Sequence, residues 1–185
     1  MNQLPDISQP AADAGLLDVA YATTDSPVGT LLLAGTKRGL VRLAFLDSTD
    51  EDVVLSDLAR RVSPRILAAP AQLDEPRREL DRYFSGRLKS FELPLDWELT
   101  RGFGRAILQA AARIPYGSVS TYKRVASEAG SPRAARAAGN ALGANPLAIV
   151  VPCHRVLHSN GGLGGYTGGL ERKRLLLAVE QGRTQ

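Results

Sequence analysis

The single cysteine of the chain, Cys153, is the residue best suited to covalent chemistry, because a thiolate is a nucleophile. It stands beside Arg155 and His154, the latter one of only two histidines. Such cationic or proton-accepting neighbours lower a thiol pKa from its free value of about 8.5. The apolar run before it predicts a strand that ends at Pro152, which has no N–H to donate. We therefore predict a reactive thiolate, against the alternative of a small buried apolar side chain.

Three other chemistries compete for the same region. Cys153, His154 and His158 are three candidate metal ligands, but zinc normally takes four and no further ligand lies nearby, so we predict no metal. A cysteine hydrolase needs the histidine to reach the thiol. Adjacent residues on an extended chain point to opposite faces. The cysteine-hydrolase hypothesis therefore requires a bridging water or a local bend between Cys153 and His154. Residues 161–169 contain six glycines but lack the Lys-Ser/Thr pair of a nucleotide phosphate-binding loop, so we do not predict a nucleotide site there.

Charge divides the chain at about residue 100. Residues 1–100 carry 11 basic and 16 acidic side chains, whereas residues 101–185 carry 12 basic and three acidic ones. A polyanion such as nucleic acid would meet little repulsion from the second part and would release counterions on binding it. Solvation of helices by Arg and Lys is the alternative that charge alone leaves open.

Three helices are predicted to position the cysteine and the positive charge. The first runs from about Phe103 to Arg113 and the second over Thr121–Glu128, capped by Ser120. The third is capped by Ser131 and runs from Pro132 towards Leu142. The second and third helices form a helix-turn-helix pattern.

The third of these helices is rich in alanine and glycine, including Ala135. Small residues permit close helix packing, which is the structural alternative to a role in binding. Arg133, Arg136 and Asn140 lie three and four residues apart and so share a polar face. Because few of its side chains could read base edges, we expect any DNA binding to act through phosphates and groove shape.

The first half of the chain predicts a small antiparallel sheet with helices, so we expect an α+β fold. We divide the chain into a flexible tail at 1–15, an N-terminal domain at 16–95 and a C-terminal domain at 100–185, joined by a connector within 86–100. The predicted elements are strands at Val19–Thr23, Thr30–Ala34 and Leu40–Phe45 and helices at about 51–62 and 71–84.

The cellular setting follows from what the sequence lacks. One cysteine cannot form an intramolecular disulfide, which favours a reducing compartment. No apolar stretch of about 18 residues and no secretory signal is present, so we expect a soluble cytoplasmic protein with no membrane partner.

A series of motifs runs in order between residues 103 and 180. These motifs are Ile114-Pro115-Tyr116-Gly117, Ser120-Thr121-Tyr122, Ala134-Ala135-Arg136-Ala137, Asn145-Pro146, Val151-Pro152-Cys153-His154-Arg155-Val156, Gly165-Tyr166-Thr167-Gly168-Gly169-Leu170 and Leu175-Leu176 through Glu180. Together they resemble the signature of the O6-alkylguanine-DNA alkyltransferases, also called methylated-DNA protein-cysteine methyltransferases. The sequence departs from the family pattern at two places: Ser118-Val119 stands where the family has an acid followed by Thr or Val, and Ile107 replaces a Trp.

The resemblance implies a fold and a reaction. The fold would combine a ribonuclease H-like N-terminal domain, a small sheet with helices, with a mostly helical, winged-helix-like C-terminal domain. Cys153 would take the alkyl group from O6 of a damaged guanine in duplex DNA, once and irreversibly, with no cofactor. O4-alkylthymine as a substrate and self-association along DNA are left open. A non-catalytic lesion-binding protein and a cysteine hydrolase are the alternatives, and relatives of the first kind lack the cysteine.

The resemblance also implies catalytic roles. Glu180 would orient His154, which would act through a water on Cys153 to form the thiolate. Asn145 would brace the turn that carries the nucleophile. Tyr122 would contact the flipped guanine and the adjacent phosphate and would protonate the base as it leaves.

The remaining implied roles concern binding. The Cys153 and Val156 carbonyls and the Thr167 amide would border the base pocket, with Tyr166 in its wall. Arg136 would enter the base stack where the guanine had been. The expected DNA-binding residues are Arg133, Ala135, Arg136 and Asn140.

Overall fold

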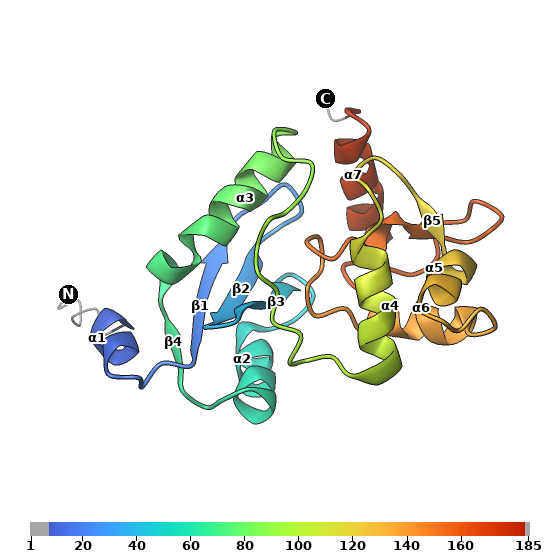
Figure 1. The fold of residues 1–185 in the computed structure, drawn as a ribbon. Coiled ribbons are helices and arrows are strands. Elements are labelled where there is room, and N and C mark those ends of the chain that lie inside the picture. Colours follow the sequence, from blue (N-terminus) through green and yellow to red (C-terminus); the bar gives the residue numbers. More distant parts are fainter. Residues whose placement is uncertain (1–7, 184–185) are drawn as a thin grey trace.

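The computed structural model describes residues 8–183, and its N-terminal half is built on a four-stranded sheet (Figure 1). The strand order is β3-β2-β1-β4, with β1 antiparallel to β2, β2 antiparallel to β3 and β4 parallel to β1. The three antiparallel strands confirm the prediction, and the three-residue β4 is an addition too short to show a pattern. The strands are β1 Val19–Thr24, β2 Leu31–Thr36, β3 Gly39–Phe45 and β4 Ile66–Ala68.

The two faces of this sheet are both buried. On β2, Leu32 and Ala34 pack in the cluster that contains helix α2 (Glu51–Arg61), whereas Leu31 and Leu33 belong to the cluster that contains helix α3 (Asp74–Phe84). This alternation is expected of a strand covered on both sides. A short 3-10 helix η1, Pro70–Leu73, leads into α3.

The N-terminal segment was expected to lack regular structure. Ser8–Asp13 nevertheless forms a short helix, α1, and residues 1–7 of the predicted tail lie outside the described residues. Ala11 packs on a small cluster of Leu17, Ala20 and Ala69, which holds this helix against the sheet.

Up to residue 183, the C-terminal half contains four α-helices, one 3-10 helix and a two-stranded parallel sheet. Helices α5 and α6 form the helix-turn-helix and pack on each other and on α4. The elements are α4 Gly102–Ala112, β5 Ser120–Thr121, α5 Tyr122–Glu128, α6 Ala135–Gly143, the 3-10 helix η2 Cys153–Arg155, β6 Val156–Leu157 and α7 Leu170–Glu180.

Two predicted helix starts are wrong. Ser120 lies in β5, and the side chain that caps α5 is Thr121, which accepts a hydrogen bond from the Arg124 N–H at 3.2 Å. Helix α6 begins at Ala135, and Pro132 lies in the preceding turn. Serine, threonine and proline mark a helix start without fixing which neighbouring residue begins it.

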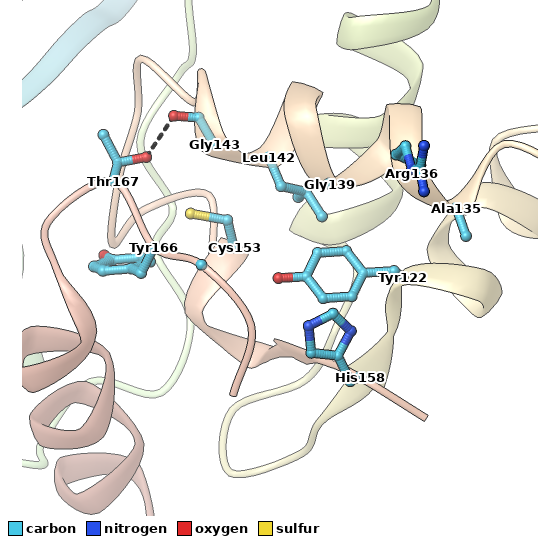
Figure 2. Close-up of a pocket in the computed structure, with 11 residues that line it drawn as sticks. Tyr122, Ala135, Arg136, Gly139, Leu142, Gly143, Cys153, His158, Tyr166 and Thr167 are labelled. Atoms are coloured by element: carbon cyan, nitrogen blue, oxygen red, sulfur yellow. Dashed lines mark hydrogen bonds between the residues drawn. The ribbon is translucent and has the colours of Figure 1, made fainter. Parts of the chain in front are cut away.

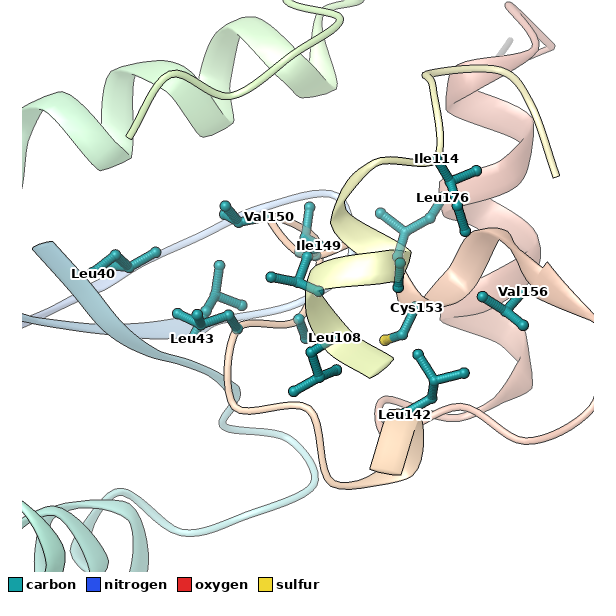
Figure 3. Packing of buried hydrophobic residues seen from close by; sticks show 14 of the residues in the cluster. Leu40, Leu43, Leu108, Ile114, Leu142, Ile149, Val150, Cys153, Val156 and Leu176 are labelled. Carbon is teal, nitrogen blue, oxygen red and sulfur yellow. The ribbon is translucent and has the colours of Figure 1, made fainter. Parts of the chain in front are cut away.

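One hydrophobic core joins the two halves (Figure 3). Leu40 and Leu43 from the N-terminal sheet face Ile149 and Val150 from the C-terminal half. Leu43 also pairs with Leu147 through a backbone bridge, and its N–H donates to the Pro146 carbonyl at 2.8 Å. The cysteine-bearing turn is therefore supported by the N-terminal domain.

The chain is an α+β protein, as predicted. Ile107, one of the two departures from the family pattern, is fully buried on α4, and Val119 of the other is half exposed in the loop before β5. Within residues 8–183, no helix is long and apolar enough to cross a membrane.

Candidate active site

The apolar run before Cys153 is a buried turn, so the predicted strand is wrong. Ile149 has φ +72°, a left-handed conformation that is strained for a β-branched residue, and it interrupts any extended run. Asn145 holds this turn: its Oδ1 accepts from the Leu147 N–H at 3.0 Å, and its Nδ2 donates to the Val151 carbonyl at 2.9 Å and to the Cys153 sulfur at 3.1 Å. Strained backbone of this kind persists where surrounding bonds fix it.

Cys153 opens the 3-10 helix η2, which supplies the local bend that an adjacent histidine needs. His154 is 0% exposed, and its Nε2 lies 2.8 Å from Oε1 of Glu180. An ionised carboxylate only accepts hydrogen bonds, so Nε2 carries the proton and Nδ1 of the neutral ring is free to accept one. Among residues 8–183, buried Nδ1 has no hydrogen-bond partner. Burial lowers the pKa of His154, which keeps the ring neutral despite the opposing effect of Glu180.

The Glu180 carboxylate is surrounded by donors. Arg155 binds it through Nε at 3.0 and 3.1 Å and through Nη2 at 2.8 Å. The Gly117 N–H donates to Oε2 at 3.2 Å, and the Tyr83 hydroxyl donates to Oε1 at 2.7 Å. Burial raises the pKa of Glu180, but the hydrogen bonds from His154 and Arg155 outweigh it and bring the pKa to about 2. The carboxylate is therefore ionised.

The thiol environment differs from the sequence prediction. Burial raises the pKa of Cys153 to about 11, while the Asn145 hydrogen bond and the charge of Lys173 act in the opposite direction. The predicted lowering by the side chains of His154 and Arg155 is wrong, because Arg155 is committed to Glu180 and the neutral His154 ring carries no charge. A hydrogen bond from the His154 backbone does act to lower the thiol pKa, but burial outweighs it. In the DNA-free protein the thiol is protonated, so its proton must be removed before the sulfur can attack.

On its other side Cys153 faces an open cavity of about 490 Å³ beneath α6 (Figure 2). Among the predicted site residues, Cys153, Tyr122, Tyr166 and Thr167 line it. So do Ala135 and Arg136 of α6. The other lining residues are Gly139, Leu142 and Gly143 of α6, His158, which the sequence suggested only as a metal ligand, and Gly165 of the glycine-rich loop.

Tyr122 crosses the cavity with its hydroxyl directed towards Cys153 (Figure 2). The ring of His158 lies beside it, with centroids 5.0 Å apart. Gly164, at φ +67°, passes so close that an added Cβ would stand 2.3 Å from the Tyr122 oxygen. Only glycine fits there. Thr167 ties the same glycine-rich loop to α6, because its hydroxyl donates to the Gly143 carbonyl at 2.8 Å.

The structure does not bring every predicted residue to the cavity. Val156 is fully buried, and its carbonyl accepts from the Nζ of Lys173 at 2.7 Å. Arg133 and Asn140 are exposed beside the cavity without lining it. Within the described residues, no three His, Cys, Asp or Glu side chains gather as a metal site.

Two buried residues of the site gave no signal in the sequence. Lys173 is fully buried on α7 and donates to the carbonyls of Val156, Leu163 and Gly165, which fastens the glycine-rich loop to β6. Tyr83 reaches Glu180 from the other domain, and no local pattern relates residues that lie so far apart in the chain.

Comparison with known proteins places the chain. The family profile described as "6-O-methylguanine DNA methyltransferase, DNA binding domain" matches residues 102–182, and the one described as "6-O-methylguanine DNA methyltransferase, ribonuclease-like domain" matches residues 19–97. A methylated-DNA–protein-cysteine methyltransferase of Mycolicibacterium paratuberculosis is 42% identical over 163 residues, 88% of this chain and 93% of that protein. One from Methanosarcina barkeri is 41% identical over 161 residues, 87% and 96% of the two chains.

Solved structures agree. The O6-methylguanine methyltransferase of Mycobacterium tuberculosis is 40% identical with a TM-score of 0.76, covering 90% of this chain and 95% of its own. The same TM-score and identity hold for the M. tuberculosis OGT in complex with DNA, with coverage of 89% and 94%. Fold and site together define a DNA-binding transferase. The chain belongs to the 6-O-methylguanine DNA methyltransferase family.

Proposed function

We propose that this protein repairs O6-alkylguanine in duplex DNA by transferring the alkyl group to the sulfur of Cys153. One observation carries the proposal: Cys153 lies between a buried His154–Glu180 pair and an open cavity that helix α6 of the helix-turn-helix covers. Groups for proton removal and for base binding thereby adjoin the same cysteine.

The cavity suits a base that has left the double helix. An O6 substituent inside a duplex cannot be reached in line by a sulfur, so the nucleotide must be extruded, at a cost of a few kcal/mol that is smaller for a poorly paired base. A volume of about 490 Å³ lies within the range of small-molecule sites. The Tyr166 ring and the glycine-rich loop around Gly165 would hold the base, with the Cys153 carbonyl and the Thr167 amide at its edges.

Helix α6 suits the extrusion. Its small residues, among them Ala135 and Gly139, allow the backbone to approach a narrow groove. Arg136 is exposed at the rim of the cavity, and no ion pair with another described residue ties it down. It can occupy the gap that the base leaves, as long side chains do in other groove-binding proteins. Arg133 and Asn140 would add contacts to the phosphates.

The transfer itself requires one proton to leave the sulfur and one to reach the base. His154 Nδ1 takes the Cys153 proton through a bridging water, and Glu180 stabilises the imidazolium that forms. The sulfur attacks the alkyl carbon, an S–C bond forms, and the C–O6 bond breaks with its electron pair moving into the guanine ring. Tyr122 donates a proton to the departing base and is later reprotonated through the His154 relay.

The product explains why one protein repairs one lesion. A thioether offers water no good leaving group, so the alkyl group stays on Cys153 and the protein is consumed. Neither a cofactor nor a metal enters any step. The same arrangement would present the O4 substituent of an extruded thymine to the sulfur, so we extend the proposal to O4-alkylthymine as a substrate. The proposal also includes the assembly of several copies of the protein along DNA, and a cytoplasmic location.

The test is a duplex with one O6-methylguanine carrying a labelled methyl group. The wild-type protein should acquire the label, and Cys153→Ser should bind the lesion duplex with unchanged affinity and acquire none. Label on the serine variant, or equal binding with an unmodified wild-type thiol after long incubation, would identify a different acceptor or a lesion-binding protein. Turnover of an ester or amide without DNA would favour a hydrolase.

A further inference from the structure

Tyr83 connects the N-terminal domain to the centre of the active site. It lies on α3, is 1% exposed, and its hydroxyl donates to Glu180 Oε1 at 2.7 Å. The same oxygen accepts from His154 Nε2 at 2.8 Å. A side chain of the ribonuclease-like domain therefore shares a carboxylate oxygen with the proposed base of the DNA-binding domain.

In this hydrogen bond Tyr83 is always the donor and Glu180 the acceptor. Burial raises the pKa of Tyr83, and the negative charge of Glu180 adds to the shift, so the phenol keeps its proton. The carboxylate of Glu180 is ionised and can only accept. Hydrogen bonds to charged acceptors are stronger than those between neutral groups.

We propose that Tyr83 is a positioning residue for alkyl transfer, contributed by the N-terminal domain, that holds the Glu180 carboxylate against His154. The inference rests on the proposed function, because it assigns Tyr83 a part in the relay that removes the Cys153 proton. It also gives the N-terminal domain a role in the reaction beyond packing.

Simple packing is the competing explanation for Tyr83. Its ring stands edge-on to Phe84 and Tyr116, with centroids 5.3 and 6.0 Å away, and is tilted against Phe91 at 5.2 Å. A phenylalanine would keep all three ring contacts. Removing the hydroxyl alone therefore separates the two explanations.

The chain offers a matched control in the same aromatic cluster. The Tyr116 hydroxyl donates to the Val179 carbonyl at 3.2 Å, next to Glu180 but not on its carboxylate. Tyr116→Phe removes a hydroxyl from the same cluster and leaves the side-chain donors to the carboxylate in place. Any general effect of losing a hydroxyl from this cluster should appear in both variants.

The expected change in pH dependence follows from the groups around Glu180. Tyr83 faces it from α3, His154 and Arg155 face it from η2, Tyr116 lies in the loop after α4, and Lys173 lies on α7 itself. Removing the Tyr83 donor leaves more of the carboxylate charge directed at His154, which raises the pKa of the imidazole. His154 then becomes protonated, and unable to act as a base, at a higher pH.

The experiment compares single-turnover methyl transfer from an O6-methylguanine duplex across a pH series for wild type, Tyr83→Phe and Tyr116→Phe. We expect Tyr83→Phe to be slower by about tenfold, which is the loss typical of one hydrogen bond to a charged group. Its rate should also begin to fall at a higher pH than the wild-type rate as the solution is made more acidic. Tyr116→Phe should match the wild type in the pH at which the rate falls.

Equal rates and equal pH profiles for the two variants would overturn the inference, since the ring contacts alone would then explain Tyr83. If Tyr83→Phe does not fold, 3-fluorotyrosine at position 83 tests the same bond, because it is a stronger donor and should move the fall in rate to lower pH. An unchanged profile with the fluorinated residue would also overturn the inference. A wild-type protein that transfers no methyl group at all would instead refute the proposed function.

Discussion

The two sides of Cys153 are built on opposite principles. On one side, His154, Arg155 and Glu180 are at most 6% exposed, and Arg155 neutralises the charge of Glu180. On the other side, Arg136 and His158 stand exposed around a cavity that is open to solvent. The sulfur lies where the two regions meet.

The difference indicates a division of labour. A buried ion pair is costly to break, so its geometry is fixed before the substrate arrives and suits the transfer of a proton. Exposed cations lose little hydration free energy when they contact phosphates, and the contact releases counterions from the DNA. Such cations therefore suit DNA binding. Substitutions on the buried side should therefore change the chemistry, and substitutions on the open side should change binding and base extrusion.

The two histidines provide the largest expected contrast, because one lies on each side. His154→Gln can still donate to Glu180 but has no base at the Nδ1 position, so transfer should slow by about a hundredfold or more. His158→Gln, at the exposed rim, should change transfer by less than about threefold. Single-turnover transfer rates and the affinity for lesion DNA measure both effects.

Affinity for lesion DNA should be unchanged in His154→Gln, which separates loss of the base from loss of folding. Equal slowing by the two histidine variants would remove the proposed distinction between the two sides of the cysteine.

A smaller contrast is expected within the open side itself. Arg136 lines the cavity and Arg133 does not, although both are exposed. Arg136→Ala should slow repair per bound complex by about tenfold, because the vacated space in the base stack is left unfilled. Arg133→Ala should weaken binding to damaged and undamaged duplexes alike. The slope of log affinity against log salt concentration should fall by about the amount expected for one lost phosphate contact.

A fluorescent base opposite the lesion would report extrusion for both arginine variants. If Arg136→Ala lowers affinity for damaged and undamaged DNA equally and leaves repair per bound complex unchanged, Arg136 is one phosphate contact among several.

The sequence predicted the parts of this molecule that local pattern determines. The three antiparallel strands of the N-terminal sheet follow from short apolar runs bounded by turn residues. The residues around Cys153 form one contiguous motif in the sequence, so they could be found together. The helix-turn-helix was predicted, but Ser120 and Thr121 are both capping residue types, so its start was misplaced by one residue.

Other features depend on burial and on contacts between residues far apart in the sequence, which local sequence pattern does not predict. The apolar run before Cys153 has the composition of a strand, yet Ile149 turns left-handed where Asn145 and the Leu43 backbone hold the chain. The raised pKa of the thiol comes from burial, whereas the sequence shows only that charged residues are neighbours. The bond from Tyr83 to Glu180 is made only when the two domains assemble.

The fate of the cysteine tests the central claim most directly. After incubation with an excess of duplex containing O6-methylguanine, peptide mass spectrometry should find one methyl group on Cys153 in every chain, with one lesion removed per protein molecule. Continued removal of lesions by a fixed amount of protein, or a methyl group on any other residue, would contradict it.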